Sequence, residues 1–182
     1  MNHKTRIVII VTLLIVFVLG IYELQSLEEK VNLKNDPITS IDATKSPIAK
    51  EDLAKLSNAE WKNRLTPEQY AVLKEGGTEI PFTSDLLHET RPGTFVTADC
   101  GEPVFRSEAK FDSGTGWPSF FEPIKGSVIE NTDTSFGMER IEIASAICHS
   151  HLGHVFDDAP QTPTGLRYCI NGVALIFIPD KK

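Results

Sequence analysis

Gly165-Leu166-Arg167-Tyr168-Cys169-Ile170-Asn171, near the C-terminus, is the stretch around which the chain is best interpreted. Its apolar context is typical of a β-strand, in which residues two apart share a face. Arg167, Cys169 and Asn171 are therefore expected on one face. A guanidinium beside a thiol favours the nucleophilic thiolate, and an asparagine can donate hydrogen bonds to a substrate oxygen. The alternative is an inert buried cysteine, as is common in apolar strands.

The composition excludes some classes of protein. The 182 residues suffice for one domain with an appendage, and 41% hydrophobic content permits a packed core. A net charge of −7, without a basic stripe beyond the extreme N-terminus, argues against a nucleic-acid partner. The cysteines are Cys100, Cys148 and Cys169. In an exported protein, this odd number favours one bridge and one free thiol.

Residues 1–23 are predicted to form an N-terminal membrane anchor, a transmembrane helix. Basic residues precede an uncharged apolar run from Ile7 to Tyr22, and acidic residues follow it. The run is somewhat shorter than the roughly 20 residues of a typical span. No A-x-A-like cleavage site follows Gly20, so an uncleaved anchor is favoured over a removed signal peptide. The charge distribution places the C-terminal bulk outside the cytoplasm.

Residues 24–59 are predicted to be a polar spacer without a core, although parts such as residues 50–56 have helical character. The globular domain is expected over residues 60–182. Its first helix should begin at Thr66-Pro67, where Gln69 completes a capping box, and should end at Gly76-Gly77.

From Phe95 onward the pattern changes to strands. Arg140-Ile141-Glu142-Ile143 alternates polar and apolar residues, and Val173–Pro179 is a nearly continuous apolar run typical of a buried strand. Glycine and proline separate these segments. The domain is therefore predicted to be mainly β and antiparallel, with short helices at its N-terminal edge.

Two further stretches carry side chains suited to chemistry. Trp117 lies in a glycine- and proline-rich turn, either as a core anchor or as the wall of a pocket for a methyl group or thioether. Cys148, His151 and His154 form a second group, which either ligates zinc or places imidazoles for acid–base chemistry beside a reactive cysteine. Plain surface histidines are a third interpretation. A Pro/Gly turn separates His154 from Cys169, as expected for adjacent antiparallel strands.

Together these stretches resemble the type B methionine sulfoxide reductases, the MsrB family, which reduce the R epimer of the sulfoxide in peptidyl methionine. The resemblance runs from about Trp61 to Pro179. It rests on five motifs in order: LTPEQY (65–70), GTEIPFT (77–83), KFDSGTGWPSF (110–120), HLGHVF (151–156) and PTGLRYCIN (163–171). It implies two antiparallel sheets in a tent-like β fold, and it makes Cys169 the catalytic nucleophile.

The resemblance also implies roles for the neighbours of the nucleophile. The implied catalytic residues besides Cys169 are His151, His154, Asn171 and Arg167. The implied substrate-binding residues are Trp117, Phe156 and Asp158. The imidazoles and the amide would shape and protonate the sulfoxide site, and the indole would receive the substrate's methyl group. The guanidinium, with Asp158 nearby, would support ionisation of the cysteine.

The chain departs from the family pattern at the structural zinc site. Many members hold zinc with two CxxC pairs, but here the corresponding stretches read Thr97-Ala98-Asp99-Cys100 and Ser145-Ala146-Ile147-Cys148. One ligand of each pair is missing, so no structural zinc and no other cofactor is expected. In an oxidising compartment, the two remaining cysteines, Cys100 and Cys148, are predicted to form a disulfide.

A further departure concerns how Cys169 is re-reduced. Many members carry a resolving cysteine where this chain has Thr115. An external thiol, such as a thioredoxin-like protein, is the favoured reductant, and Cys100 or Cys148 as resolving thiol is the alternative.

The leading hypothesis is an anchored, extracytoplasmic (periplasmic or extracellular) reductase that repairs exported proteins carrying methionine R-sulfoxide. A thiol peroxidase, which needs no methyl-binding aromatic, is one alternative. The other is a metal-binding β module without turnover that uses Cys148, His151 and His154. Metal analysis and a Cys169→Ser variant separate these hypotheses.

Overall fold

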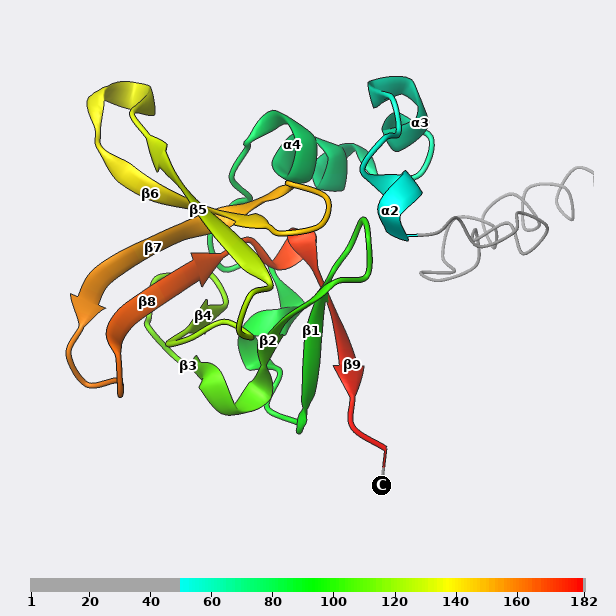
Figure 1. Cartoon of the computed structure of the whole chain (residues 1–182). Coiled ribbons are helices and arrows are strands. Elements are labelled where there is room, and N and C mark those ends of the chain that lie inside the picture. Colours follow the sequence, from blue (N-terminus) through cyan, green and yellow to red (C-terminus); the bar gives the residue numbers. More distant parts are fainter. Residues whose placement is uncertain (1–49, 182) are drawn as a thin grey trace, which may run out of the picture. The chain divides into compact units, whose positions relative to one another are not determined.

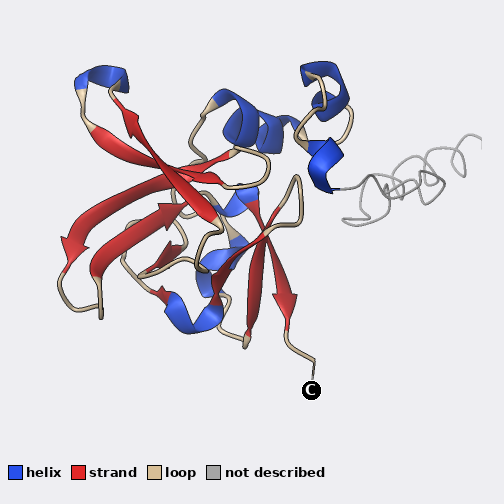
Figure 2. Cartoon of the chain, in the orientation of Figure 1, coloured by secondary structure: helices blue, strands red, loops and turns tan. Residues whose placement is uncertain are grey.

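Short strands separated by glycine and proline turns favour antiparallel pairing, because tight turns can join only antiparallel strands. The structure, a computed structural model, describes residues 50–181. Within this range nine strands form two sheets, and every neighbouring pair is antiparallel. The prediction of a mainly β domain with two antiparallel sheets is therefore confirmed (Figure 2).

The last strand of the chain joins the first two in the smaller sheet, and the strands between them form the larger sheet (Figure 1). The smaller sheet has the order β2-β1-β9, formed by β2 (Pro103–Arg106), β1 (Gly93–Thr97) and β9 (Leu175–Pro179). The larger has the order β3-β4-β8-β7-β6-β5, formed by β3 (Lys110–Phe111), β4 (Ser119–Phe120), β8 (Gly165–Ile170), β7 (His151–Ala159), β6 (Arg140–Ser145) and β5 (Val128–Asp133).

Three short α-helices precede the strands in the described part of the chain. They are α2 (Lys50–Leu53), α3 (Asn58–Lys62) and α4 (Pro67–Glu75). Single-turn 3₁₀ helices join later elements: η1 (Asp85–His88), η2 (Ser107–Ala109), η3 (Ser135–Gly137) and η4 (Gly172–Ala174). The predicted limits of α4 are confirmed, since Thr66 and Gln69 form the capping box and Gly76 ends the helix with a φ of 70°.

Aromatic rings from both sheets form the core. Phe105 and Phe120 stack with ring centroids 4.3 Å apart, and Phe95 meets Phe120 edge-on at 4.9 Å. On β8, Tyr168 and Ile170 are buried in this core. Because side chains alternate along a strand, Cys169, which lies between these two core residues, projects from the opposite face of β8.

The expectation of a buried strand over Val173–Pro179 is wrong in two respects. Its first residues belong to η4, and β9 begins only at Leu175. The strand also lies at the edge of the smaller sheet, where Ile176 and Ile178 are about half exposed (48% and 51%). An apolar run alone does not distinguish an edge strand from a central one.

The last part of the predicted spacer contributes to the core of the described residues. Leu53 on α2 is only 7% exposed and belongs to the core cluster, and Leu56 packs against that cluster. The prediction that residues 24–59 contribute nothing to the core is therefore wrong for α2.

The predicted membrane anchor at residues 1–23, like the rest of residues 1–49, lies outside the described residues. In the described range no helix has the length and apolar character needed to cross a membrane.

Candidate active site

Cys169 occupies a central position in the larger sheet. Its Cα pairs with that of Ser119 on β4 and with that of His154 on β7. The sequence predicted that His154 and Cys169 lie on adjacent antiparallel strands, and this adjacency is confirmed. Paired residues of an antiparallel ladder project to the same face, so an imidazole-bearing side chain lies next to the thiol.

Gly153 permits this close pairing of β7 and β8. A Cβ atom at this position would collide with the backbone carbonyl oxygen of Cys169. The close approach of the two strands therefore requires glycine between Leu152 and His154, a requirement that the sequence alone does not reveal. It fixes the distance between the strand that carries the histidines and the strand that carries the thiol.

Two opposing effects act on the thiol. Burial raises the pKa of Cys169 above its usual value, while a hydrogen bond with Thr115 and the charge of Arg167 lower it in part. The Thr115 hydroxyl lies 3.8 Å from the sulfur. Arg167 thus acts in the expected direction, although burial has the larger effect on the pKa of the thiol.

A row of hydroxyl groups runs from Thr115 to Ser119, the residue that pairs with Cys169 on β4. The Oγ1 atom of Thr115 lies 2.9 Å from Oγ of Ser113, which lies 2.7 Å from Oγ of the buried Ser119. Sequence reasoning identified the turn but missed Ser113 and Ser119. The signal was available in the sequence, since Ser113, Thr115 and Ser119 lie within seven residues of one another.

Arg167 is held from two sides. It forms two hydrogen bonds with the carboxylate of Asp158, at 2.8 and 2.7 Å, and its guanidinium lies 4.4 Å from the centre of the Phe156 ring. Phe156 and Asp158 were expected to bind substrate. The structure places them around the guanidinium, where they fix its orientation beside Cys169.

Each of the two imidazoles forms a hydrogen bond with a carboxylate from the β5–β6 hairpin. Nδ1 of His151 lies 2.7 Å from Glu142, and Nε2 of His154 lies 2.8 Å from Asp133. The ring centroids of the two histidines are 5.3 Å apart. Burial lowers the pKa of His154, although the hydrogen bond with Asp133 opposes this shift. Nε2 of His151 is buried and has no hydrogen-bond partner among the described residues.

Sequence reasoning missed the hairpin carboxylates. Arg140 anchors Asp133 through a 2.6 Å contact, and hydrogen bonds from Ser135 and His154 hold the pKa of Asp133 well below its usual range. The alternation that identified β6 gave no sign of this role. The contacts depend on the register shift after Ile143, where β6 and β7 lose their regular pairing.

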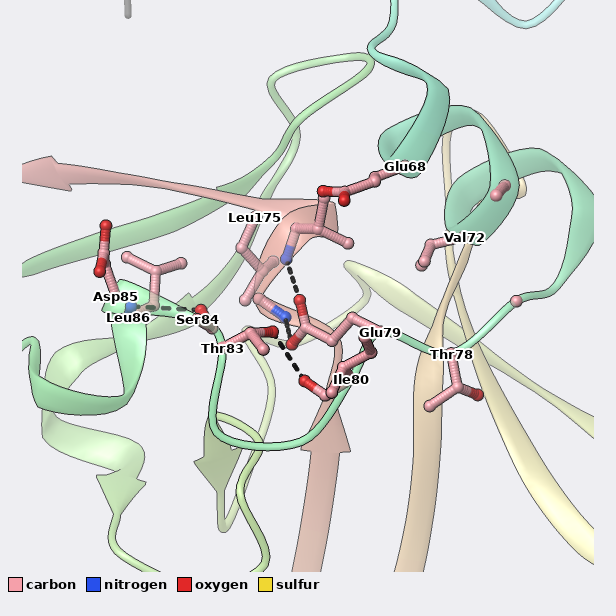
Figure 3. Close-up of a pocket in the computed structure, with 14 residues that line it drawn as sticks. Glu68, Val72, Thr78, Glu79, Ile80, Thr83, Ser84, Asp85, Leu86 and Leu175 are labelled. Atoms are coloured by element: carbon pink, nitrogen blue, oxygen red, sulfur yellow. Dashed lines mark hydrogen bonds between the residues drawn. The ribbon is translucent and has the colours of Figure 1, made fainter.

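Glu79 joins the two substrate-side residues and was also missed. Its backbone N–H donates to Oδ1 of Asn171 (2.9 Å), and its carbonyl accepts from Nε1 of Trp117 (3.2 Å). Its carboxylate accepts from the backbone N–H groups of Gly172 (2.5 Å) and Val173 (2.8 Å), as Figure 3 shows. Burial raises the pKa of Glu79. Glu79 thus forms hydrogen bonds with the indole of Trp117, the side-chain amide of Asn171 and the backbone at the start of η4.

Asn171 is almost fully buried just after β8 ends. Its Nδ2 donates to the carbonyl of Leu152 at 2.9 Å, while its Oδ1 accepts from Glu79. The side chain is thereby fixed, and one Nδ2 hydrogen and one lone pair of Oδ1 remain for another group.

Comparison with known proteins assigns this arrangement to a family. Residues 65–179 match the SelR domain. A protein of Agrobacterium fabrum (strain C58), named peptide methionine sulfoxide reductase MsrB, is 55% identical over 124 residues, which cover 68% of this chain and 91% of that protein. A protein of the same name from Chromohalobacter salexigens is 54% identical over 126 residues, covering 69% of this chain and 95% of that protein.

The chain belongs to the MsrB family. The matched range contains Cys169, the histidine-bearing strand and the loop of Trp117, so the family assignment covers every residue of the candidate site. The family resemblance drawn from the five sequence motifs is confirmed.

The structural zinc site seen in many MsrB proteins would lie at Cys100 and Cys148. In this chain the two sulfur atoms are joined in a disulfide, with Cα atoms 6.5 Å apart. The residues at the other two ligand positions are used elsewhere. Oγ1 of Thr97 accepts from the N–H of Glu102, and Oγ of Ser145 accepts from the N–H of Ser150, both at 3.2 Å. These residues do not provide the four ligands that zinc requires.

A metal site built from Cys148, His151 and His154 is not supported by the geometry. Within the described part of this MsrB chain, the one cluster of three metal-donor side chains is Asp99, Cys100 and Cys148. In that cluster both sulfurs are bonded to each other, and the carboxylate of Asp99 lies 2.7 Å from Nζ of Lys74. The alternative of a metal-binding module therefore has no converging ligand set at the histidines.

Proposed function

We propose that this chain reduces methionine R-sulfoxide in polypeptides and that Cys169 is the nucleophile. The family assignment makes it an oxidoreductase of the peptide methionine sulfoxide reductase type. The observation that carries the mechanism is the pairing of Cys169 with His154 on neighbouring strands, with the rings of His151 and His154 only 5.3 Å apart.

The proposed first half-reaction transfers the oxygen atom to the enzyme. A sulfoxide sulfur is a poor electrophile until its oxygen is protonated, so a proton donor must act together with the thiolate. Nε2 of His151 is buried and without a partner, and the carboxylate of Glu142 holds the other ring nitrogen. We infer that the Cys169 thiol passes its proton to a neighbouring imidazole, and that the resulting imidazolium donates this proton to the sulfoxide oxygen while the thiolate attacks the sulfur. The products are methionine and Cys169 sulfenic acid.

The remaining site residues would bind and orient the substrate. Trp117 would receive the sulfoxide's methyl group, as its apolar face suits such a group. The Nδ2 hydrogen of Asn171 that no described residue uses would hold the oxygen. Arg167, fixed by Asp158, would stabilise negative charge on the sulfur of Cys169, in line with the direction in which it moves the pKa of that thiol.

The second half-reaction would use external thiols. The sulfenic acid condenses with one thiol, a second thiol releases Cys169, and the products are water and a new disulfide in the reductant. Thr115 stands where a resolving cysteine would, and Cys100 and Cys148 are already bonded to each other. A thioredoxin-like protein is the proposed reductant. After one turnover without reductant, no disulfide between Cys169 and Cys100 or Cys148 is therefore expected, and a trapped disulfide of this kind would assign the resolving role to that pair.

The proposed setting of this activity rests on sequence. The charged and apolar pattern of residues 1–23 supports a membrane anchor with the catalytic domain on the extracytoplasmic side. In that compartment the substrates would be exported proteins with oxidised methionines, and a disulfide would persist where a zinc thiolate site would not. We propose accordingly that no structural zinc or other cofactor is needed. Protease protection of the domain in spheroplasts or protoplasts, in which exposed extracytoplasmic proteins are cleaved, would place it in the cytoplasm instead.

An assay on the two epimers tests the activity. The full chain is incubated with a peptide that contains methionine R-sulfoxide or its S epimer, with dithiothreitol as reductant. Reduction of the R epimer alone is expected, with no reduction by Cys169→Ser. Equal rates on both epimers, or activity that survives Cys169→Ser, would refute the proposal.

A further inference from the structure

We propose that the turn formed by Ile80-Pro81-Phe82-Thr83, called here the rim turn, and the cavity beside it bind the polypeptide segment that flanks the oxidised methionine. This inference rests on the proposed function, because it assigns a second contact surface to the same substrate. It concerns residues outside the reacting centre. The cavity's lining contains neither Cys169 nor the catalytic histidines.

The rim turn exposes two large apolar side chains beside the active-site loop. Ile80 is 72% exposed and Phe82 is 70% exposed. The backbone N–H of Phe82 donates to the carbonyl of Gly116 at 2.8 Å, and the Phe82 ring lies so close to Gly116 that a Cβ atom there would clash with it. Gly116 precedes Trp117, so the exposed ring lies next to the residue proposed to receive the methyl group.

The backbone of Phe82 is strained. Its φ is 65°, a left-handed conformation that glycine and asparagine adopt readily and that bulky residues avoid. A turn with Pro81 before this position normally favours glycine here. An aromatic ring held in this conformation and exposed to solvent gains little from packing. Its location at the mouth of a catalytic site suggests that it contacts a ligand.

A cavity of about 540 Å³ lies beside the rim turn, and Glu79 is one of the residues that line it. Its apolar lining includes Ile80, Leu86, Val173 and Leu175, and Figure 3 shows Glu79 between these segments with its carboxylate bonded to the start of η4. The volume is in the range of sites that take an apolar side chain with part of its backbone. The cavity and the exposed ring of Phe82 thus lie on either side of the short loop that contains Glu79. The backbone of Glu79 also holds Trp117 and Asn171 through hydrogen bonds.

The short distance along a polypeptide from the reaction site to the cavity indicates what binds there. A methionine side chain that enters the site leaves its backbone at the mouth, and neighbouring residues extend from there at about 3.3–3.6 Å each. Two or three residues therefore suffice to reach across the rim turn to the cavity. Glu68 and Asp85 line the cavity and form no salt bridge with another described residue, so apolar or basic flanking residues are favoured over acidic ones.

The test compares a peptide with a minimal substrate. The full chain reduces either a hexapeptide, with methionine R-sulfoxide between leucine and lysine residues, or N-acetyl-methionine-R-sulfoxide N-methylamide. Dithiothreitol is the reductant in both assays, so docking of a protein reductant plays no part. The readout is the ratio of kcat/KM for the hexapeptide to kcat/KM for the blocked amino acid, measured for the wild type, Phe82→Asn, Ile80→Ser and the control Ile178→Ser.

The ratio should fall about tenfold in Phe82→Asn and about threefold in Ile80→Ser, as expected for the loss of apolar contact area. It should not change in Ile178→Ser, whose parent side chain is 51% exposed on β9. Asparagine tolerates the left-handed conformation, so Phe82→Asn should keep the melting temperature of the wild type. That measurement excludes misfolding as the cause.

Two results would overturn the inference. The ratio could stay the same in both rim-turn variants, as when both substrates slow equally, or the ratio in the control variant could fall by as much as in the rim-turn variants. The failure of the proposed function has a different signature, because the wild-type chain would then reduce neither substrate.

Discussion

The Cys169 thiol illustrates how one residue balances opposing effects. Burial raises its pKa, and the Thr115 hydroxyl and the Arg167 charge lower it in part. Since Cys169 is the free cysteine in the structure, the alkylation rate of the protein reports its ionisation. The rate of reaction with iodoacetamide should therefore rise with pH to a midpoint above the usual cysteine value of about 8.5.

Substitution of Thr115 tests the sign of this balance. Thr115→Val keeps the shape of the side chain but removes the hydrogen bond that favours the thiolate, so the alkylation midpoint should move to still higher pH. A midpoint below that of an ordinary cysteine in the wild type would show instead that the guanidinium outweighs burial.

Glu79 is predicted to act as a positioning residue. Glu79→Ala leaves the N–H groups of Gly172 and Val173 without their partner, which should lower the free energy of unfolding by about 2–3 kcal/mol. Because η4 and Asn171 would also shift, kcat should fall by about tenfold, with a smaller change in KM. Urea unfolding and steady-state kinetics measure the two effects.

Two further variants separate positioning by Glu79 from a loss of stability alone. Glu79→Gln keeps one acceptor oxygen and should recover part of kcat, while the exposed Glu75→Ala serves as the control. Full kcat in Glu79→Ala despite reduced stability would show that Glu79 does not position the site.

At the scale of elements, the sequence predicted the positions of the strands better than the contacts that their residues form. The capping box and Gly76 defined α4, and the turn after Asp158 indicated that the strands of His154 and Cys169 would be adjacent. The partners of the histidines were not predictable, because Asp133 and Glu142 reach the rings only through the pairing of β5, β6 and β7. Glu79 escaped notice for a related reason, since half of its contacts come from its backbone.

The helix α2 gives a prediction at this scale. Leu53 is buried in the core cluster although it lies in a stretch with the composition of a spacer. Leu53→Ala should lower the free energy of unfolding by about 2–4 kcal/mol, measured by urea denaturation. The exposed Ala54→Ser on the next position should have little effect. Equal stabilities of Leu53→Ala and the wild type would mean that α2 does not pack on the domain in solution.

At the scale of the whole molecule, the disulfide links two distant parts of the chain. Cys100 and Cys148 are 48 positions apart, and a crosslink over that span should contribute roughly 4 kcal/mol on the chain-entropy model. The Cys100→Ala/Cys148→Ala variant should therefore unfold at lower urea concentration than the oxidised wild type. Reductant should destabilise the wild type and leave the variant unchanged. A difference below about 1 kcal/mol would contradict a structural role.

The oxygen-transfer step at Cys169 is tested most directly by a single turnover without reductant. The full chain, with excess peptide containing methionine R-sulfoxide and the sulfenic-acid reagent dimedone, should form about one methionine per chain and carry one adduct, on Cys169. Mass spectrometry locates the adduct, and Cys169→Ser should form neither product. Methionine formation by that variant, or an unmodified Cys169 after the wild type has turned over, would contradict Cys169 as the oxygen acceptor.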